Sequence, residues 1–295
     1  TTVNKGDYNL NRLAIGKFIL IGDHKQLPAV VVQPQDSSKV SEESLHKIGL
    51  TDCRNSLFER LHHLNRIQGT EGIVEMLRKQ GRMHPAISEF VNRYFYNGRL
   101  DIVPMPHQTE PLPFKDRTED NAWTAFAAHT RIGFISATPY KNEQNTKSNK
   151  KEAETVAELV ETLIRLHRRD DIPFHPEQQI GIIVPFRAQI AMIRKALADR
   201  LIPYASTPTI DTVERYQGSQ RDIIIFSTTV SRFYQLATLS EPVITEGQEI
   251  DRKLNVALTR ARKQFFMTGN DTLLRRCTAY RNFLNFLKDS QVLHI

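Results

Sequence analysis

The sequence predicts an α/β protein: a mostly parallel sheet with helices on both of its faces. Short runs of apolar and β-branched residues are typical of strands that are buried on both faces. Stretches with apolar residues at helical spacing alternate with these runs, and such alternation favours parallel sheets. The elements that carry this prediction are the strands Ile180–Val184, Ile223–Thr229 and Lys263–Thr268, and the helix Arg187–Leu201.

The same periodicities predict further elements. Lys17–Gly22 and Arg131–Ala137 read as short buried strands. Asn149 is followed three residues later by Glu152, which is an asparagine variant of the capping box. We therefore expect a helix that begins after Asn149 and continues to about Arg168.

Two more amphipathic helices are predicted in the first third of the chain. Asn55–Arg66 has leucines and a phenylalanine at helical spacing, with Asn55 or Ser56 as its N-cap. Pro85–Tyr96 begins with a proline, which suits the first turn of a helix. The stretch Pro104–Pro113 carries four prolines and is predicted to be a surface loop.

Composition narrows the class of protein. The chain has 295 residues, a net charge of +7 and a pI of about 9.4, and this basic balance favours a polyanionic partner. Cys53 and Cys277 do not have the spacing of a metal site, so we expect reduced thiols, no metal ligands and a cytoplasmic location. No run approaches the ~18 apolar residues of a membrane-spanning helix, so no membrane partner is expected.

Polar residues follow the first predicted strand. The sequence Gly22–Pro28 (GDHKQLP) places a carboxylate, Asp23, and an amide, Gln26, after that strand. Open α/β sheets bind ligands outside the carboxyl ends of their strands. A turn with a hydrogen-bonded aspartate is the alternative interpretation.

A second stretch places an arginine just before a helix. In Gln80–Pro85 (QGRMHP), Arg82 precedes the predicted helix start at Pro85. A guanidinium binds phosphate oxygens through two parallel hydrogen bonds and keeps its charge at neutral pH. A solvated surface arginine is the alternative.

Two further stretches precede buried strands. In Asp211–Asp222, Gly218 would let a ligand approach the backbone closely, and polar side chains surround it. Leu254–Arg262 (LNVALTRAR) is predicted to place two arginines on a helix. Arg260 would then lie beside the core, where a charge is costly unless it meets an anionic partner.

In this order the four stretches resemble motifs of the superfamily 1 helicases, which read GDxxQLPP, QYRMHP, TVxxFQGxExD and NVALTRAR. The pattern is most similar to the branch that includes the nonsense-mediated-decay helicase and related 5′-to-3′ DNA and RNA helicases. The resemblance extends from about residue 17 to residue 270. Supporting similarity occurs in Ser56–Leu61, Asn149–Ala153 and Gly181–Gln189.

The resemblance implies a RecA-like fold of the P-loop NTPase superfamily and a role for each matching residue. Gln26 matches the glutamine that senses the γ-phosphate of ATP. Arg82 and Arg260 match arginines that reach across the ATP cleft to that phosphate, as an arginine finger does. The residues that match nucleotide-binding positions of the family are Asp23, Gln217, Gly218 and Gln220.

Two positions depart from the family pattern. The tyrosine that stacks on adenine in the family is replaced by Gly81, which has no ring. The glutamate near the ribose is replaced by Gln220, which can hydrogen-bond but carries no charge. Base selectivity and nucleotide affinity are therefore open, whereas the phosphate-sensing residues are all present.

The sequence lacks the Gly-rich loop with its lysine, and the Asp-Glu pair, that hold phosphates and Mg²⁺ in such motors. The resemblance places the Asp-Glu pair just before Thr1, so we expect the chain to be a piece of a longer protein. Residues 1–70 would be the remainder of the first motor domain, and residues 71–295 the second domain with a C-terminal helix. No role is assigned to the loop at 104–113 or to the insertion at 233–248.

The functional expectation is an ATP-dependent helicase or translocase. The longer protein would use ATP and Mg²⁺, whereas this chain alone would bind no cofactor tightly and would be inactive. Its partners would be single-stranded DNA or RNA and the first motor domain. A RecA-like nucleic-acid-binding scaffold without ATP turnover and the helicase part of a helicase–nuclease are the alternatives.

Overall fold

The computed structural model describes residues 17–28, 31–117, 121–140, 147–203 and 207–295. The chain forms two units. The N-terminal unit consists of Thr1–His24 and Pro28–Glu75, and the C-terminal unit of Lys25–Leu27 and Met76–Ile295. The three residues Lys25–Leu27 thus belong to the C-terminal unit, although the chain on both sides of them belongs to the other. No helix among the described residues is long and apolar enough to span a membrane.

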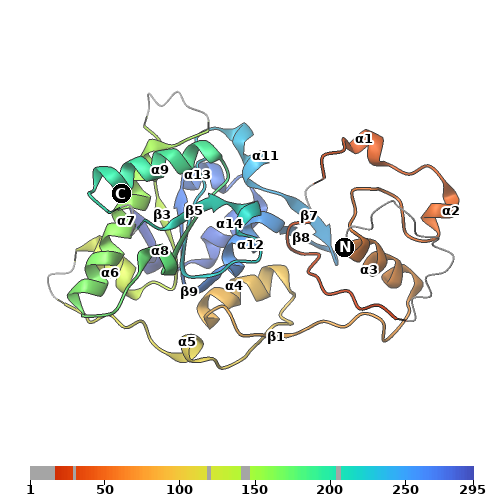
Figure 1. The fold of residues 1–295 in the computed structure, drawn as a ribbon, viewed down its shortest axis with the longest axis horizontal. Coiled ribbons are helices and arrows are strands. Elements are labelled where there is room, and N and C mark those ends of the chain that lie inside the picture. Colours follow the sequence, from red (N-terminus) through yellow and green to blue (C-terminus); the bar gives the residue numbers. More distant parts are fainter. Residues whose placement is uncertain (1–16, 29–30, 118–120, 141–146, 204–206) are drawn as a thin grey trace, which may run out of the picture. The chain divides into compact units, whose positions relative to one another are not determined.

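A parallel sheet of six strands forms the centre of the C-terminal unit (Figure 1). Every pair of neighbouring strands in it is parallel. In spatial order the strands are β10 (Val292–His294), β3 (Ile132–Ser136), β9 (Ala261–Gly269), β6 (Arg221–Ser227), β4 (Ile180–Val184) and β5 (Thr209–Thr212).

Side chains of the central strands alternate between two apolar layers. Ile223 and Ile225 of β6 pack into one layer, and Ile224 and Phe226 into the other. Because successive side chains of a strand point to opposite faces, a continuous apolar run is needed to cover both. Fully buried rings such as Phe265 reinforce the second layer.

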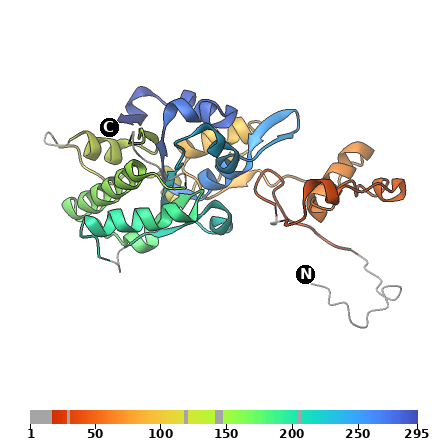
Figure 2. The ribbon, with the colours of Figure 1, turned by 90° about the horizontal axis from the view of Figure 1, so that it is seen from above.

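Helices cover both faces of this sheet, and Figure 2 shows α7 and α9, drawn in green, on one side and the blue C-terminal helices on the other. The first face carries α6 (Ala122–His129), α7 (Lys150–Arg169) and α9 (Arg187–Asp199). The second face carries α4 (Pro85–Phe95), α10 (Val213–Tyr216), α12 (Arg252–Thr259) and α14 (Thr278–Phe286). The predicted fold class, an α/β protein with a mostly parallel sheet and helices on both faces, is confirmed.

Short elements complete the C-terminal unit. β1 (Lys79–Gln80) and β2 (Asp101–Ile102) form a parallel pair, and β7 (Pro242–Thr245) and β8 (Gln248–Asp251) form an antiparallel hairpin. The remaining one-turn helices of this unit, besides α10, are α5 (Pro106–Thr109), α8 (Pro176–Gln179), α11 (Leu236–Leu239) and α13 (Asp271–Leu274). Its 3₁₀ turns are η3 (Phe233–Gln235) and η4 (Asp289–Gln291).

Helix starts follow the predicted capping chemistry. Ser56 caps α3 (Leu57–Gln68) and forms a full capping box with Glu59. Asn149 caps α7 by accepting a hydrogen bond from the Glu152 backbone. The Glu152 side chain, however, accepts from the Asn149 side-chain amide and not from its backbone.

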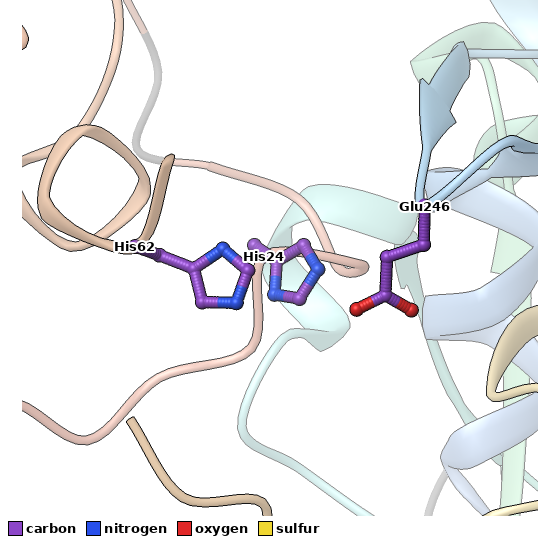
Figure 3. A group of neighbouring side chains, drawn as sticks. All are labelled: His24, His62 and Glu246. Atoms are coloured by element: carbon purple, nitrogen blue, oxygen red, sulfur yellow. The ribbon is translucent and has the colours of Figure 1, made fainter. Parts of the chain in front are cut away.

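The N-terminal unit contains α1 (Gln35–Ser38), α2 (Glu43–His46) and α3. His24 stacks on His62 of α3 with 4.3 Å between ring centroids, and Figure 3 shows these two rings side by side. None of the buried apolar side chains among the described residues belongs to this unit. The unit therefore has no apolar core within its described part.

Three sequence predictions were wrong in detail. Lys17–Gly22 is not a strand, and Ile19 and Ile21 are 76% and 86% exposed. A strand needs a partner for its backbone N–H and C=O groups, and none of the sheets in the described residues includes this segment. The stretch Pro104–Pro113 is not loop throughout, because α5 lies within it and buries Gln108.

The third error concerns the end of the predicted helix Leu254–Arg262. Helix α12 ends at Thr259, Arg260 is its C-cap, and Arg262 lies in strand β9. Ala261 pairs with Arg221 of β6, so the sheet ladder takes over from the helix at this point. Only one of the two arginines therefore lies at the end of the helix.

Candidate functional site

The predicted site residues of the C-terminal unit gather at the amino-terminal edge of its sheet. The loop Gly218–Gln220 leads directly into β6, and Arg260 leads directly into β9. The first residues of the two strands, Arg221 and Ala261, are partners, and the Arg221 backbone N–H donates to the Arg260 carbonyl at 3.0 Å. Parallel pairing of β6 with β9 therefore brings together Ser219 and Arg260, which are 41 positions apart in the sequence.

Arg82 reaches the same edge from the loop before α4. The backbone N–H of His84 donates to the Arg262 carbonyl at 2.8 Å, which attaches this loop to β9. Arg82 donates from Nε to Gln220 Oε1 at 2.9 Å and from Nη1 to the Thr259 carbonyl at 3.1 Å. Its guanidinium thus contacts both loops of the edge.

Arg260 is almost fully buried, with 3% of its surface exposed. Its Nε donates to the Val256 carbonyl at 3.1 Å, one turn back along α12. Its Nη2 donates to the Thr259 hydroxyl at 3.1 Å and to Gln26 Oε1 at 2.7 Å. Nη1 is 3.4 Å from the Ser219 carbonyl. These neutral oxygens hold the guanidinium in one orientation beside the core.

Gln26 enters the site on the short segment Lys25–Leu27. Gln217, which follows α10, donates from Nε2 to the Leu27 carbonyl at 2.8 Å. This bond attaches the backbone next to Gln26 to the loop that contains Gly218 and Gln220. The Gln26 amide oxygen then accepts the hydrogen bond from Arg260.

The two guanidinium groups converge on one residue. Arg82 contacts the Thr259 carbonyl, and Arg260 contacts the Thr259 hydroxyl. Burial lowers the pKa of Arg82 from its ordinary value, but a guanidinium remains charged at neutral pH. Two half-buried or buried cations at one place create a positive potential that an anion would neutralise. The two guanidinium groups therefore give this edge of the sheet a positive charge.

Gly218 has the conformation that its place in the loop requires. Its φ is +85°, a backbone conformation that residues with a side chain rarely adopt. A Cβ added at this position would meet no atom within 4 Å. The backbone of this loop is thus open to the surface. Gln220 is exposed apart from its bond to Arg82.

Gly81 does not need to be glycine for conformational reasons. Its φ is not positive, and an added Cβ would lie 3.5 Å from Met105 Cγ, which is an ordinary contact. Tyr216, an aromatic residue of another motif, cannot take the place of a tyrosine at position 81, because it is 2% exposed and its hydroxyl donates to the Thr209 carbonyl at 2.7 Å. Phe186 is half-buried at the N-cap of α9.

One predicted residue belongs to the other unit. Asp23 belongs to the N-terminal unit, so it is not among the residues brought together within the C-terminal unit. The other predicted residues, Gln26, Arg82, Gln217, Gly218, Gln220 and Arg260, all belong to the C-terminal unit.

Three residues that support Arg82 were not predicted from the sequence. Gln80 accepts hydrogen bonds from the backbone N–H groups of Arg82 and Met83 at 3.0 and 2.9 Å. Gln108 donates to the Met83 carbonyl at 2.8 Å, and His107 lies 2.8 Å from the Arg82 carbonyl. Gln80 lies within a motif that the sequence singles out. Nothing in the sequence marks His107 or Gln108, which come from the proline-containing stretch.

Comparison with known proteins identifies the family of this chain. A family model described as an AAA domain matches residues 53–272. The DNA polymerase alpha-associated DNA helicase A of Saccharomyces cerevisiae is 30% identical over 270 residues, which cover 88% of this chain and 35% of that protein. Helicase sen1 of Schizosaccharomyces pombe is 30% identical over 268 residues, covering 90% of this chain and 14% of that protein.

An uncharacterized ATP-dependent helicase of Methanocaldococcus jannaschii is 26% identical over 283 residues, covering 94% of this chain and 36% of that protein. The chain thus spans about a third or less of the length of these relatives. The family model covers well over half of the chain, and all three relatives are named as helicases. The chain therefore belongs to the AAA domain family of the superfamily 1 helicases and corresponds to a C-terminal portion of such a protein.

Proposed function

We propose that this chain supplies the γ-phosphate-sensing half of the ATP site in an ATP-dependent nucleic-acid helicase or translocase. Arg82 and Arg260 would bind and neutralise the γ-phosphate oxygens, and Gln26 would report the presence of that phosphate. In phosphoryl transfer, a well-placed arginine stabilises the charge of the transition state and contributes roughly 10³- to 10⁵-fold in rate.

The observation that carries this proposal is the convergence of two segments, those of Arg82 and Gln26, on the C-terminal end of α12. Arg82 and Arg260 both contact Thr259, and Gln26 contacts Arg260. A surface role for Arg82 would not require fixed bonds to Gln220 and to the Thr259 carbonyl. A cluster of this kind favours a phosphate ligand over a purely structural role.

The other half of the ATP site would come from the part of the first motor domain that lies outside this chain. That domain would supply the Gly-rich loop and the carboxylates that hold Mg²⁺. Residues of this chain would then orient the γ-phosphate and exclude water from its outer face. Arg260 already has its donors aligned by the Val256 and Ser219 carbonyls, so little reorganisation would accompany phosphate binding.

The division of the chain into an N-terminal and a C-terminal unit supports a domain boundary close to residue 70. We propose that residues 1–70 complete the first motor domain and that residues 71–295 form the second, with Asp23 acting from the first. The N-terminal unit has exposed apolar side chains at Phe18, Ile19 and Ile21 and no buried apolar residue in its described part. Exposed apolar side chains that lie together mark a surface that another part of a protein covers.

The nucleic-acid partner is proposed from charge and from kinship. The net charge of +7 favours binding of a polyanion, and the relatives include proteins named as DNA helicases and a DNA replication helicase/nuclease. We propose single-stranded DNA or RNA as the partner of the longer protein.

The test uses the longer protein with Arg82→Ala and Arg260→Ala. ATP turnover in the presence of single strands should fall at least about 100-fold, because an arginine that stabilises the phosphate charge of the transition state contributes ~10³- to 10⁵-fold to the rate. The affinity for single strands should change less than about threefold, because the arginines act on the phosphate and not on the strand. Lysine at either position should restore little, because an ammonium lacks the planar fork of the guanidinium.

Arg194→Ala is the matched control. Arg194 is exposed on α9, and the substitution removes the same charge away from the site. Equal and mild losses in all three variants would show that Arg82 and Arg260 have surface roles. Strand binding by a longer protein that does not hydrolyse ATP would instead favour the nucleic-acid-binding scaffold, which the departures at Gly81 and Gln220 make the second candidate.

A further inference from the structure

The hairpin β7–β8 ends in a glutamate that points back into its own unit. Glu246 and Gly247 form the turn, with φ values of +54° and +76°. A non-glycine residue in this left-handed region is uncommon. Strand β7 and the turn belong to the insertion at 233–248, for which the sequence suggests no role, and β8 begins where that insertion ends.

Glu246 joins two segments of the C-terminal unit. Its Oε2 accepts a hydrogen bond from Lys25 Nζ at 2.8 Å and another from Asn97 Nδ2 at 3.3 Å, and it also forms an ion pair with Arg99. Partial burial would raise the pKa of Glu246, but the hydrogen bonds from Lys25 and Arg99 outweigh it and hold the pKa at about 2. The carboxylate is therefore charged at neutral pH.

Lys25 forms an ion pair with this carboxylate and is buried. Its side chain is 3% exposed, and Nζ also donates to the Phe95 carbonyl at 2.9 Å and lies 5.5 Å from the centre of the Tyr96 ring. A buried ammonium is strongly destabilised when an acceptor is removed. Glu246 therefore helps to determine whether Lys25, and the chain attached to it, stays in this place.

The backbone around Gln26 is held on both sides. Asn255 of α12 donates from Nδ2 to the Lys25 carbonyl at 2.8 Å, and Gln217 donates to the Leu27 carbonyl at 2.8 Å. With the Lys25 side chain bound by Glu246, the main chain at Gln26 has little freedom to move. The Gln26 amide is thereby presented to Arg260, which caps the same helix that carries Asn255.

We infer that Glu246 is a positioning residue for the phosphate sensor: through Lys25 it sets the contact between Gln26 and Arg260. This inference rests on the proposed function of Gln26 and Arg260. It assigns a role to the hairpin β7–β8, which would keep Lys25–Leu27 on the second domain and so make the response to the γ-phosphate depend on the hairpin. Glu246 itself need not touch the nucleotide.

The experiment measures the preference of the longer protein for a non-hydrolysable ATP analogue over ADP. Only the analogue has the γ-phosphate. A general loss of protein stability would weaken the binding of the analogue and of ADP alike, whereas a defect in phosphate sensing would weaken only the binding of the analogue. We expect Glu246→Gln to reduce this preference about 3- to 10-fold, the range for loss of one well-placed hydrogen bond. Glu249→Gln is the matched control, because Glu249 is exposed on β8 of the same hairpin and loses the same charge.

Combination with Gln26→Ala separates the inference from the proposed function. If Glu246 acts through Gln26, the double variant Gln26→Ala/Glu246→Gln should show the same preference as Gln26→Ala alone. Additive losses, or an unchanged preference in Glu246→Gln when Gln26→Ala reduces it, would overturn the inference. An unchanged preference in Gln26→Ala itself would contradict the proposed function instead.

A folding defect would not leave the question open. Thermal melting of each variant shows whether the protein is folded at the assay temperature. If Glu246→Gln does not fold, Glu246→Asp replaces it, since this variant keeps the charge but shortens the reach to Lys25. Glu246→Asp should then reduce the preference for the analogue, and a preference equal to that of the unmodified protein would overturn the inference.

Discussion

Replacing Gly181 with alanine would place a methyl group inside the sheet, next to Tyr216. Tyr216 precedes the loop of the candidate site that contains Gly218 and Gln220. The new Cβ would lie 2.7 Å from the Tyr216 hydroxyl and 2.9 Å from both Arg221 Cγ and Ile224 Cδ1. Tyr216 is buried and donates its hydroxyl hydrogen to the Thr209 carbonyl, so it cannot move away freely. Tyr216 is also two residues before Gly218, so its displacement would move the loop that contains Gln220.

The expected cost follows from these contacts. Overpacking a well-packed core costs about 1–3 kcal/mol, and loss of the Tyr216 hydrogen bond would add about 1 kcal/mol. A unit of this size loses roughly 2–4 °C of melting temperature per kcal/mol. We therefore expect Gly181→Ala to melt about 2–16 °C below the unmodified chain in differential scanning calorimetry, by the same scaling.

Two companion variants sharpen this prediction. Gly81→Ala adds the same methyl group where the nearest contact is an ordinary 3.5 Å, so the free energy of unfolding should change by less than about 0.5 kcal/mol. Tyr216→Phe removes the obstructing oxygen, so Gly181→Ala/Tyr216→Phe should lose less stability than the sum of the two single variants. The reasoning is refuted if Gly181→Ala melts with the unmodified chain or if the losses simply add.

Further outcomes are expected for nucleotide selectivity, pH and the buried network. In the longer protein, Gly81→Tyr should lower the Michaelis constant for ATP more than that for GTP, since stacking contributes about 1–3 kcal/mol; equal effects on both would exclude stacking. Burial, with Arg131 and His107 nearby, lowers the pKa of His84 to about 4. Between pH 6.5 and about 4 the unfolded chain binds a proton that native His84 does not, so the free energy of unfolding falls as pH falls. His84→Asn keeps a cap acceptor and should flatten this dependence in urea titrations; an unchanged slope would contradict it. Glu152→Gln should lower the free energy of unfolding by about 1–3 kcal/mol, because the buried carboxylate accepts from Ser227 and Thr229; an unchanged urea midpoint would contradict this.

Local chemistry explains why most elements could be predicted from the sequence. The Ser56 capping box and the Asn149 cap each depend on residues within one helical turn. The apolar run Ile223–Phe226 fills both layers of the core, as a central parallel strand must. Signals of this kind are contained in a few consecutive residues, so they do not require knowledge of the rest of the fold.

The errors occurred where a partner elsewhere in the chain decides the structure. Lys17–Gly22 has the composition of a strand, but a strand forms only beside another strand. Arg262 has helical neighbours in the sequence, but pairing of Ala261 with β6 ends the helix before it. Gln108 lies in a proline-containing stretch and is buried because it reaches Met83 from 25 residues away.

The candidate site shows the same division. The order of the motifs predicts Arg82, Arg260 and Gln26 as site residues. It does not predict that both arginines contact Thr259. Glu246 and Lys25 form their contact although they are 221 positions apart in the sequence. Neither the charge of Glu246 nor its spacing in the sequence predicts this contact. Contacts over such distances follow from the parallel sheet order and the hairpin, which only the folded structure reveals.

The central claim is that this chain holds the γ-phosphate-sensing half of an ATP site that needs a first motor domain for turnover. Steady-state ATP hydrolysis, measured for this chain and for the longer protein with and without single strands, tests it most directly. We predict no turnover by the chain alone and strand-stimulated turnover by the longer protein. Turnover by the chain alone that is abolished by Arg260→Ala would contradict the account.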